Sequence, residues 1–311
     1  MTDRASTRFD DVILTGGTGR SGTTIVGLLI SRHSQIALSR PTEIRLLTDG
    51  NGLLDLHLGR KVGRYKRLLF NDWAHLQRFR QRLYGQWWTR DAKLSPNKPN
   101  QMPGRQVGLL QSISKDQLDD LYFSMRREFK FDKSNACREF LRGIVEIHKA
   151  ESKKSMWVDT TPINIARARE LHGFLDGVRF IHMVRDGRDA ISSVVKEPWG
   201  PNSFDEGLNW WRGRMIKSLN SAKAVGPAML TLALEDLAID KRESSYLKLI
   251  EFLGLRDEEK VRDYFENNVL AEKVRRGRWR SEVPNEIEFN KKYFDIVAEL
   301  KEINSSVPLY L

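Results

Sequence analysis

The sequence predicts an α/β fold, in which a parallel sheet is flanked by helices and carries a helical insertion. Two observations support this prediction. Short apolar runs of strand length alternate with helical patterns before residue 60 and again over residues 156–240, and helical crossovers between buried strands favour parallel pairing. Between these regions, amphipathic helical periodicity prevails. We therefore expect a single domain over residues 1–311, with a helical insertion at about 61–150.

The first predicted element is an apolar strand that runs into the stretch DVILTGGTGRSGTT, at residues 11–24. A helix is expected from there to about His33, followed by a short extended piece at residues 36–38. Within the insertion, a loop rich in proline and glycine is expected at residues 95–108, because these residues interrupt helices.

Beyond the insertion, three apolar runs are predicted strands, and several amphipathic runs are predicted helices. The strands are MWVD, RFIHMV and MLTLAL. One helix is expected to open near TPINIARARE. Further helices are expected at DAISSVV, SSYLKLIEFLGL, DEEKVRDYFENNVL and EIEFNKKYFDIVAELKEI.

Composition limits the class of protein. Cys137 is the only cysteine, so no intramolecular disulfide is possible, and a reducing compartment fits. No signal-peptide pattern or run of about 18 apolar residues occurs, so we expect a cytoplasmic protein without a membrane span. With 52 Lys and Arg against 41 Asp and Glu, the net charge of +11 favours an anionic ligand, although a basic face can also serve solubility alone.

The glycine loop is the most informative motif. Gly16, Gly17, Gly19 and Gly22 allow a tight turn after the strand, so that backbone N–H groups and the start of the next helix point at an anion. The spacing is that of a phosphate-binding loop, G-x-x-x-x-G-K-[ST], except that Thr23 stands in the lysine position. We therefore predict a P-loop-type parallel sheet.

A metal-dependent P-loop kinase or NTPase is the rival interpretation. Such an enzyme uses the loop lysine and an aspartate at the end of a second strand to hold Mg²⁺. Here the lysine is absent, and the strand RFIHMV ends in Arg185, a cation where the Mg²⁺ ligand would stand. The histidines show no metal-ligand spacing, and we predict no metal site.

Arg20 lies inside the loop and is followed by Ser21, Gly22, Thr23 and Thr24, which places a permanent cation and hydroxyl donors around one anionic group. The stretch GGTGRSGTT resembles the 5′-phosphosulfate loop of sulfotransferases that use 3′-phosphoadenosine 5′-phosphosulfate (PAPS). The resemblance is to tyrosylprotein sulfotransferases in particular, and to related bacterial sulfotransferases. It implies that these five residues hold the phosphosulfate, and that Arg20 also stabilises the bridging oxygen during transfer.

A second anion site is expected in RFIHMVRDGRDAISSVV, where a guanidinium, a hydroxyl and a helix N-terminus can converge on one phosphate. The resemblance implies that Arg185 and Ser193 bind the 3′-phosphate of PAPS and of its product 3′-phosphoadenosine 5′-phosphate (PAP). In the basic stretch RRGRWRSEVP, Arg276, Gly277 and Arg278 are further candidates for phosphate contact. A solvated basic loop is at least as good an interpretation of that stretch.

Glu43 is the candidate catalytic base. Tyrosylprotein sulfotransferases carry E-T-R after the first helix, and PTEIRLL offers Glu43-Ile44-Arg45 at nearly the same place. The resemblance implies that Glu43 takes the proton of the acceptor. Two positions depart from the family pattern, because Thr160 stands where the family has a lysine, and Leu234 stands where it has a tyrosine that contacts the cofactor.

The sequence thus predicts a PAPS-dependent sulfotransferase that moves a sulfuryl group to a hydroxyl or phenol acceptor by in-line transfer. The acceptor is open among a small molecule, a carbohydrate, a lipid and a peptide tyrosine, and the oligomeric state is equally open. We do not expect a nucleic-acid partner. A basic nucleic-acid-binding module is the rival from outside enzymology, but the apolar residues of the basic, aromatic stretch at 64–88 fall at helical spacing.

Overall fold

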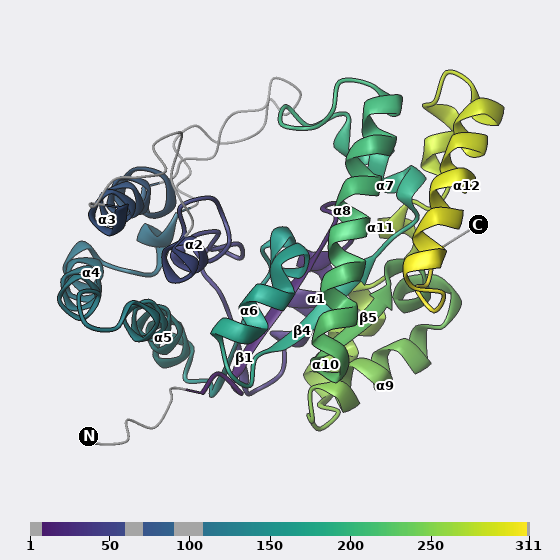
Figure 1. Ribbon diagram of the computed structural model, residues 1–311. Coiled ribbons are helices and arrows are strands. Elements are labelled where there is room, and N and C mark those ends of the chain that lie inside the picture. The colour runs from purple at the N-terminus through teal and green to yellow at the C-terminus, as the bar shows by residue number, and fades with distance from the viewer. Residues whose placement is uncertain (1–7, 60–70, 90–107, 310–311) are drawn as a thin grey trace. The chain divides into compact units, whose positions relative to one another are not determined.

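A five-stranded sheet forms the centre of the fold in the computed structural model, which describes residues 8–59, 71–89 and 108–309. The strand order is β2-β3-β1-β4-β5. Figure 1 labels β1, β4 and β5. The strands are β1 (Val12–Gly17), β2 (Ile36–Leu38), β3 (Met156–Asp159), β4 (Arg179–Val184) and β5 (Met229–Ala233). Parallel pairing sets Gly16 opposite His182 on β4, and Phe180 on β4 opposite Met229 on β5. The predicted α/β fold with a parallel sheet flanked by helices is confirmed.

The chain divides into two compact units. One comprises Met1–Val12, Ala37–Asp159 and Glu170–Val178, and the other comprises Ile13–Ile36, Thr160–Arg169 and Arg179–Leu311. We call them the helical unit and the loop unit, and describe each by itself.

The helical unit holds the described part of the predicted insertion. Its helices are α2 (Leu53–Leu58), α3 (Asn71–Arg82), η1 (Leu83–Trp88), η2 (Leu109–Gln111), α4 (Lys115–Glu128), α5 (Lys133–Ser152) and most of α6 (Ala168–Phe174). Helix α4 begins with a capping box, in which Ser114 and Gln117 satisfy each other's backbone N–H groups. Residues 60–70 and 90–107, which include nearly all of the predicted loop at 95–108, lie outside the described residues.

Helix α5 is tied to the entry of β1 by charge. The Asp11 carboxylate accepts hydrogen bonds from Arg142 and Lys149 on α5, at 2.8 Å and 2.7 Å. Burial by itself raises the pKa of Asp11, but these two cations outweigh it and hold the pKa below its ordinary value.

The loop unit contains the remaining helices. They are α1 (Thr23–Ile30), η3 (Pro162–Arg167), α7 (Gly187–Val194), α8 (Phe204–Val225), η4 (Gly226–Ala228), η5 (Asp236–Asp240), α9 (Arg242–Phe252), α10 (Glu259–Asn268), α11 (Ala271–Val274), η6 (Arg278–Ser281) and α12 (Glu286–Ile303). Helices α8 and α12 lie side by side (Figure 1). Between them, the fully buried rings of Trp211 and Tyr293 pack with centroids 5.3 Å apart.

Helix boundaries differ from prediction in two places. The helix expected near residues 161–170 begins as the 3-10 helix η3, which packs tightly on β1 and whose Asn164 donates to the Thr15 carbonyl at 3.4 Å. The helix expected to reach His33 ends at Ile30. After it, the N–H groups of Arg32 and His33 bond to carbonyls three residues earlier, those of Leu29 and Ile30, instead of four residues earlier as in an α-helix. Within the described residues, no helix combines the length and apolar character needed to cross a bilayer.

Gly16 marks the tightest packing behind β1. A Cβ atom there would lie 2.6 Å from the Pro162 carbonyl oxygen and 2.8 Å from the Ile165 side chain. We expect Gly16→Ala to lower the free energy of unfolding by about 1–3 kcal/mol, since backbone cannot yield as a flexible side chain can. Denaturant unfolding of the full chain measures this.

Gly173→Ala is the matched control for that substitution. A Cβ at Gly173, near the end of α6, meets nothing within 4 Å among the described residues, so alanine should be neutral or stabilising by up to about 1 kcal/mol. Equal effects of the two substitutions would contradict this account of the packing on β1.

Candidate functional site

The glycine loop turns by left-handed backbone conformations. Gly19, Arg20 and Gly22 have φ angles of 91°, 59° and 91°, and Gly22 is the N-cap of α1. Successive N–H groups in such a turn point into one concavity, and the helix N-terminus adds its dipole. The backbone of the loop therefore has the left-handed turn that the predicted anion cradle requires.

The loop is supported from two sides. A Cβ atom at Gly17 would lie 2.3 Å from the Met183 carbonyl oxygen on β4, so only glycine allows this approach. On the other side, the buried Leu234 side chain would meet a Cβ at Gly22 at 2.8 Å. The residue at the position of the family tyrosine thus packs against the loop as an apolar support.

The hydroxyl residues Ser21, Thr23 and Thr24 differ in their surroundings. The Ser21 Oγ is fully buried and finds no hydrogen-bond partner among the described residues. An orphaned buried hydroxyl is costly unless a ligand or water satisfies it. Thr23 is also buried, whereas Thr24 is exposed at the first turn of α1. Ser21 is therefore the hydroxyl of the loop that most needs a ligand.

Arg20 meets the second predicted anion site. Its Nε donates to Ser193 Oγ on α7 at 2.9 Å, and its Nη1 lies 3.7 Å from Glu197. The Arg185 guanidinium donates from Nη1 to the Arg20 carbonyl at 3.1 Å and from Nη2 to the Val274 carbonyl at 2.5 Å. The structure thus brings Arg20, Arg185 and Ser193 together, although 173 positions separate Arg20 from Ser193.

Arg185 is a largely buried cation. Burial lowers its pKa, and the carboxylates of Asp189, Glu235 and Asp186 act in the opposite direction. Its Nε has no partner among the described residues. A guanidinium held in this way retains donor capacity for an anion.

The basic stretch at 276–278 folds back on acidic partners. Arg276 Nη1 contacts both carboxylate oxygens of Asp240, at 3.0 Å and 2.9 Å, and Arg278 Nε donates to Glu282 at 2.6 Å. The Gly277 N–H donates to Asp189 at 2.8 Å. The three predicted contacts to phosphate are thus occupied by protein groups in this conformation.

Glu43 belongs to the helical unit. It is half-buried and lies in an irregular segment rather than in a helix. The fully buried Asp159 at the end of β3 accepts from the Ile44 N–H at 2.9 Å, and Ser39 Oγ donates to the Thr42 carbonyl at 2.8 Å. These bonds fix the backbone on both sides of the carboxylate.

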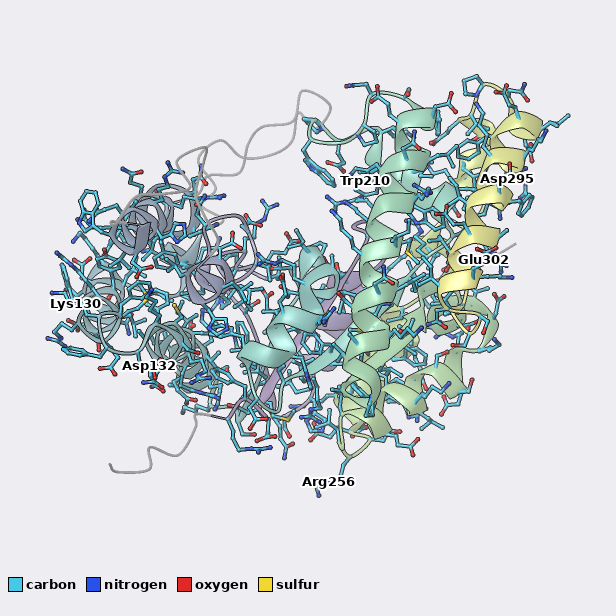
Figure 2. All side chains as sticks on the ribbon, in the orientation of Figure 1. Lys130, Asp132, Trp210, Arg256, Asp295 and Glu302 are labelled. Carbon is cyan, nitrogen blue, oxygen red and sulfur yellow. The ribbon has the colours of Figure 1, made fainter. Side chains whose placement is uncertain are left out.

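Two residues near the loop escaped sequence reasoning. Arg214 on α8 donates to the Thr18 carbonyl at 3.0 Å and stacks on the ring of Trp210, 4.3 Å from its centroid. Trp210 is labelled on α8 in Figure 2. Glu235, fully buried after β5, accepts from the Asp186 N–H at 2.9 Å. The adjacent tryptophans Trp210 and Trp211 were a visible signal for α8, but nothing in the local sequence marks Glu235 as buried.

Comparison with known proteins identifies the class. A glycine loop leads from the first strand of a parallel sheet into a helix N-terminus, an arrangement suited to anion binding. Residues 12–259 match the family model described as "Sulfotransferase family". The chain therefore belongs to the sulfotransferase family and is a transferase enzyme.

A solved structure agrees in fold. The sulfotransferase domain from the Synechococcus PCC 7002 olefin synthase matches with a TM-score of 0.51 and 16% identity, over 94% of this chain and 97% of that chain. Sulfotransferase STF9 from Mycobacterium avium matches with a TM-score of 0.48 and 13% identity, over 97% and 79%. No curated protein sequence matches the chain. The match to the olefin synthase domain shows a shared fold.

Glu235 predicts a pH dependence of stability. Burial raises its pKa to about 7, from an ordinary value of 4.5. Between these two values the folded protein keeps a proton that the unfolded chain has released, so the free energy of unfolding falls as pH rises from about 4.5 to about 7. Glu235→Gln removes this contribution, and its stability should fall less steeply than that of the unmodified protein.

Denaturant unfolding of both proteins at several pH values between 4.5 and 8 measures the effect. The difference in unfolding free energy should change in favour of the variant as pH rises. Parallel pH profiles would show that Glu235 titrates in the folded protein as it does in the unfolded chain.

Proposed function

We propose that this sulfotransferase takes the sulfuryl group from PAPS and transfers it to a hydroxyl or phenol by in-line transfer. The observation that carries the proposal is the convergence of Arg20, Arg185 and Ser193 beside a loop of left-handed backbone. Two permanent cations and a hydroxyl suit a ligand with two anionic groups and require no metal.

The residues present fit such a donor. The buried Ser21 Oγ and the Arg185 Nε both have unused hydrogen-bonding capacity among the described residues. Both belong to motifs that, by family resemblance, hold opposite ends of PAPS. When bound, PAPS supplies an activated sulfuryl group.

The loop residues would hold the phosphosulfate. Arg20, Ser21, Gly22, Thr23 and Thr24 contribute the guanidinium, backbone N–H groups and hydroxyls. To do so, Arg20 exchanges its present contacts with Ser193 and Glu197 for anionic oxygens. The same guanidinium then offsets negative charge that develops on the bridging oxygen.

Arg185 and Ser193 would hold the 3′-phosphate. Ser193 accepts from Arg20 through its oxygen, so its O–H group stays able to donate to a phosphate. Arg276, Gly277 and Arg278 remain candidates for this phosphate. They would first have to leave Asp240, Asp189 and Glu282.

Glu43 would accept the proton of the attacking hydroxyl, with Arg45 nearby in sequence as a further cation. A general base needs a fixed orientation, which the bonds from Asp159 and Ser39 support. We further propose a cytoplasmic enzyme of one domain, in which the helical insertion at about 61–150 shapes the acceptor site. The acceptor is a hydroxyl-bearing small molecule, carbohydrate, lipid or peptide tyrosine.

Calorimetric titration with PAP in EDTA tests the donor. We expect metal-free binding, and a loss of about 100-fold in Arg185→Ala, because hydrogen bonds to charged groups contribute roughly 1.5–3 kcal/mol each. Arg212→Ala is the matched control: Arg212 pairs with the half-exposed Glu299, and its loss changes net charge equally. Clear binding of ATP·Mg²⁺ without binding of PAP would contradict the proposal in favour of the kinase.

Glu43→Gln tests the base. The amide cannot accept a proton, so transfer from PAPS to a panel of phenols and alcohols should fall by roughly 10²–10⁴-fold. PAP affinity should stay within about twofold, because a base contributes little to donor binding. Glu146→Gln, in the same unit, serves as control. Near-normal transfer by Glu43→Gln would assign the base elsewhere.

A further inference from the structure

A buried carboxylate on α7 organises the segment from Arg275 to Glu282, which we call the clasp. Asp189 is 2% exposed. Its Oδ2 accepts from the Gly277 N–H at 2.8 Å, and its Oδ1 accepts from the Trp279 N–H at 3.2 Å. The pKa of Asp189 is raised by burial, and the two N–H donors oppose this shift by favouring the ionised form.

The backbone of the clasp is shaped for this carboxylate. Arg275 and Gly277 have left-handed φ angles of 54° and 79°. This turn directs two N–H groups, two residues apart, at one side chain, as in a nest for an anion. Asp189 thus occupies the anion-binding concavity of the clasp, which is therefore not open to a phosphate in this conformation.

The far end of the clasp is also fastened to α7. Glu282 accepts from the Ser192 hydroxyl and pairs with Lys196, both on or just after α7. It also accepts from Arg278 within the clasp at 2.6 Å. Both ends of the segment are therefore held by one helix, the helix that carries Ser193.

The clasp has a direct link to Arg185. The Val274 carbonyl, immediately before the clasp, accepts from Arg185 Nη2 at 2.5 Å, while Arg185 Nη1 donates to the loop carbonyl of Arg20 at 3.1 Å. The plane of the guanidinium is thus set by one carbonyl from the loop and one from the clasp. The negative charge of Asp189 favours the charged form of this largely buried guanidinium.

We infer that Asp189 is a positioning residue that gives the donor site its selectivity for a 3′-phosphate, by holding the clasp and thereby Arg185 in one orientation. This inference rests on the proposed function. Asp189 does not contact the ligand itself. It acts through its hydrogen bonds with the Gly277 and Trp279 N–H groups, through the Val274 carbonyl that accepts from Arg185, and through its negative charge near Arg185. The backbone of the clasp therefore orients Arg185 in the donor site, independently of any contact that the arginine side chains of the clasp make with a ligand.

If Asp189 only stabilised the fold, the expected result would differ. Loss of the Asp189 bonds would then lower stability and weaken all ligands of the site by a similar factor. If Asp189 positions Arg185, loss of its bonds instead weakens the binding of a ligand only to the extent that the ligand contacts Arg185. PAP and adenosine 5′-monophosphate (AMP) differ only in the 3′-phosphate, so the ratio of their affinities separates the two roles.

The experiment is calorimetric titration of the full chain with PAP and with AMP in EDTA, alongside thermal unfolding. We expect the unmodified protein to prefer PAP by roughly 100-fold, and Asp189→Asn to reduce this preference to about 10-fold or less, mainly through weaker binding of PAP. Asp189→Glu keeps the charge but displaces the carboxylate, and should also reduce the preference. It covers the case in which the asparagine variant does not fold.

Asp205→Asn is the matched control, because it removes the same charge from an exposed residue paired with Lys292. It should leave the PAP-to-AMP ratio unchanged. An unmodified protein without preference for PAP would overturn the proposed function itself. A clear preference that persists in folded Asp189 variants would overturn this inference alone and leave the proposed function standing.

Discussion

The site depends on one close approach, that of Gly17 at the end of β1 to the Met183 carbonyl on β4. Only the absence of a side chain permits it. Because β1 and β4 run in parallel, their carboxyl ends leave the sheet together, and the loop after one lies beside Arg185 after the other. Two motifs far apart in sequence thereby share one set of hydrogen bonds.

Arg185 is the centre of that set. Burial is unfavourable for a cation and lowers the pKa of Arg185, and the nearby acidic groups of Asp189, Glu235 and Asp186 offset only part of this effect. Glu235 in turn holds the backbone N–H of Asp186, and Asp189 holds the clasp. The acidic residues around Arg185 therefore fix the cation and the backbone of the proposed anion site.

Sequence reasoning predicted the elements whose signals are local. The apolar runs of β3, β4 and β5 and the glycines after β1 needed no knowledge of distant partners. The family motifs assigned Arg20 to one anion site and Arg185 and Ser193 to a second, and only the fold shows that these residues meet. The pairs of Arg276 with Asp240 and of Gly277 with Asp189 span 36 and 88 positions, and no periodicity encodes them. For the same reason the sequence marked Leu234 as a departure, whereas its packing against Gly22 became visible only in the fold. Glu43 stays a prediction.

The bond between Arg20 and Ser193 has a consequence for inhibitors. A neutral adenosine analogue that displaces Arg20 from Ser193 would break this bond and return nothing stronger. A compound with a single anionic group would draw Arg20 away and leave the serine hydroxyl to water. Compounds that present two anionic groups at the spacing of these residues regain both interactions at once, so bidentate anions are the rational starting point for a competitive ligand.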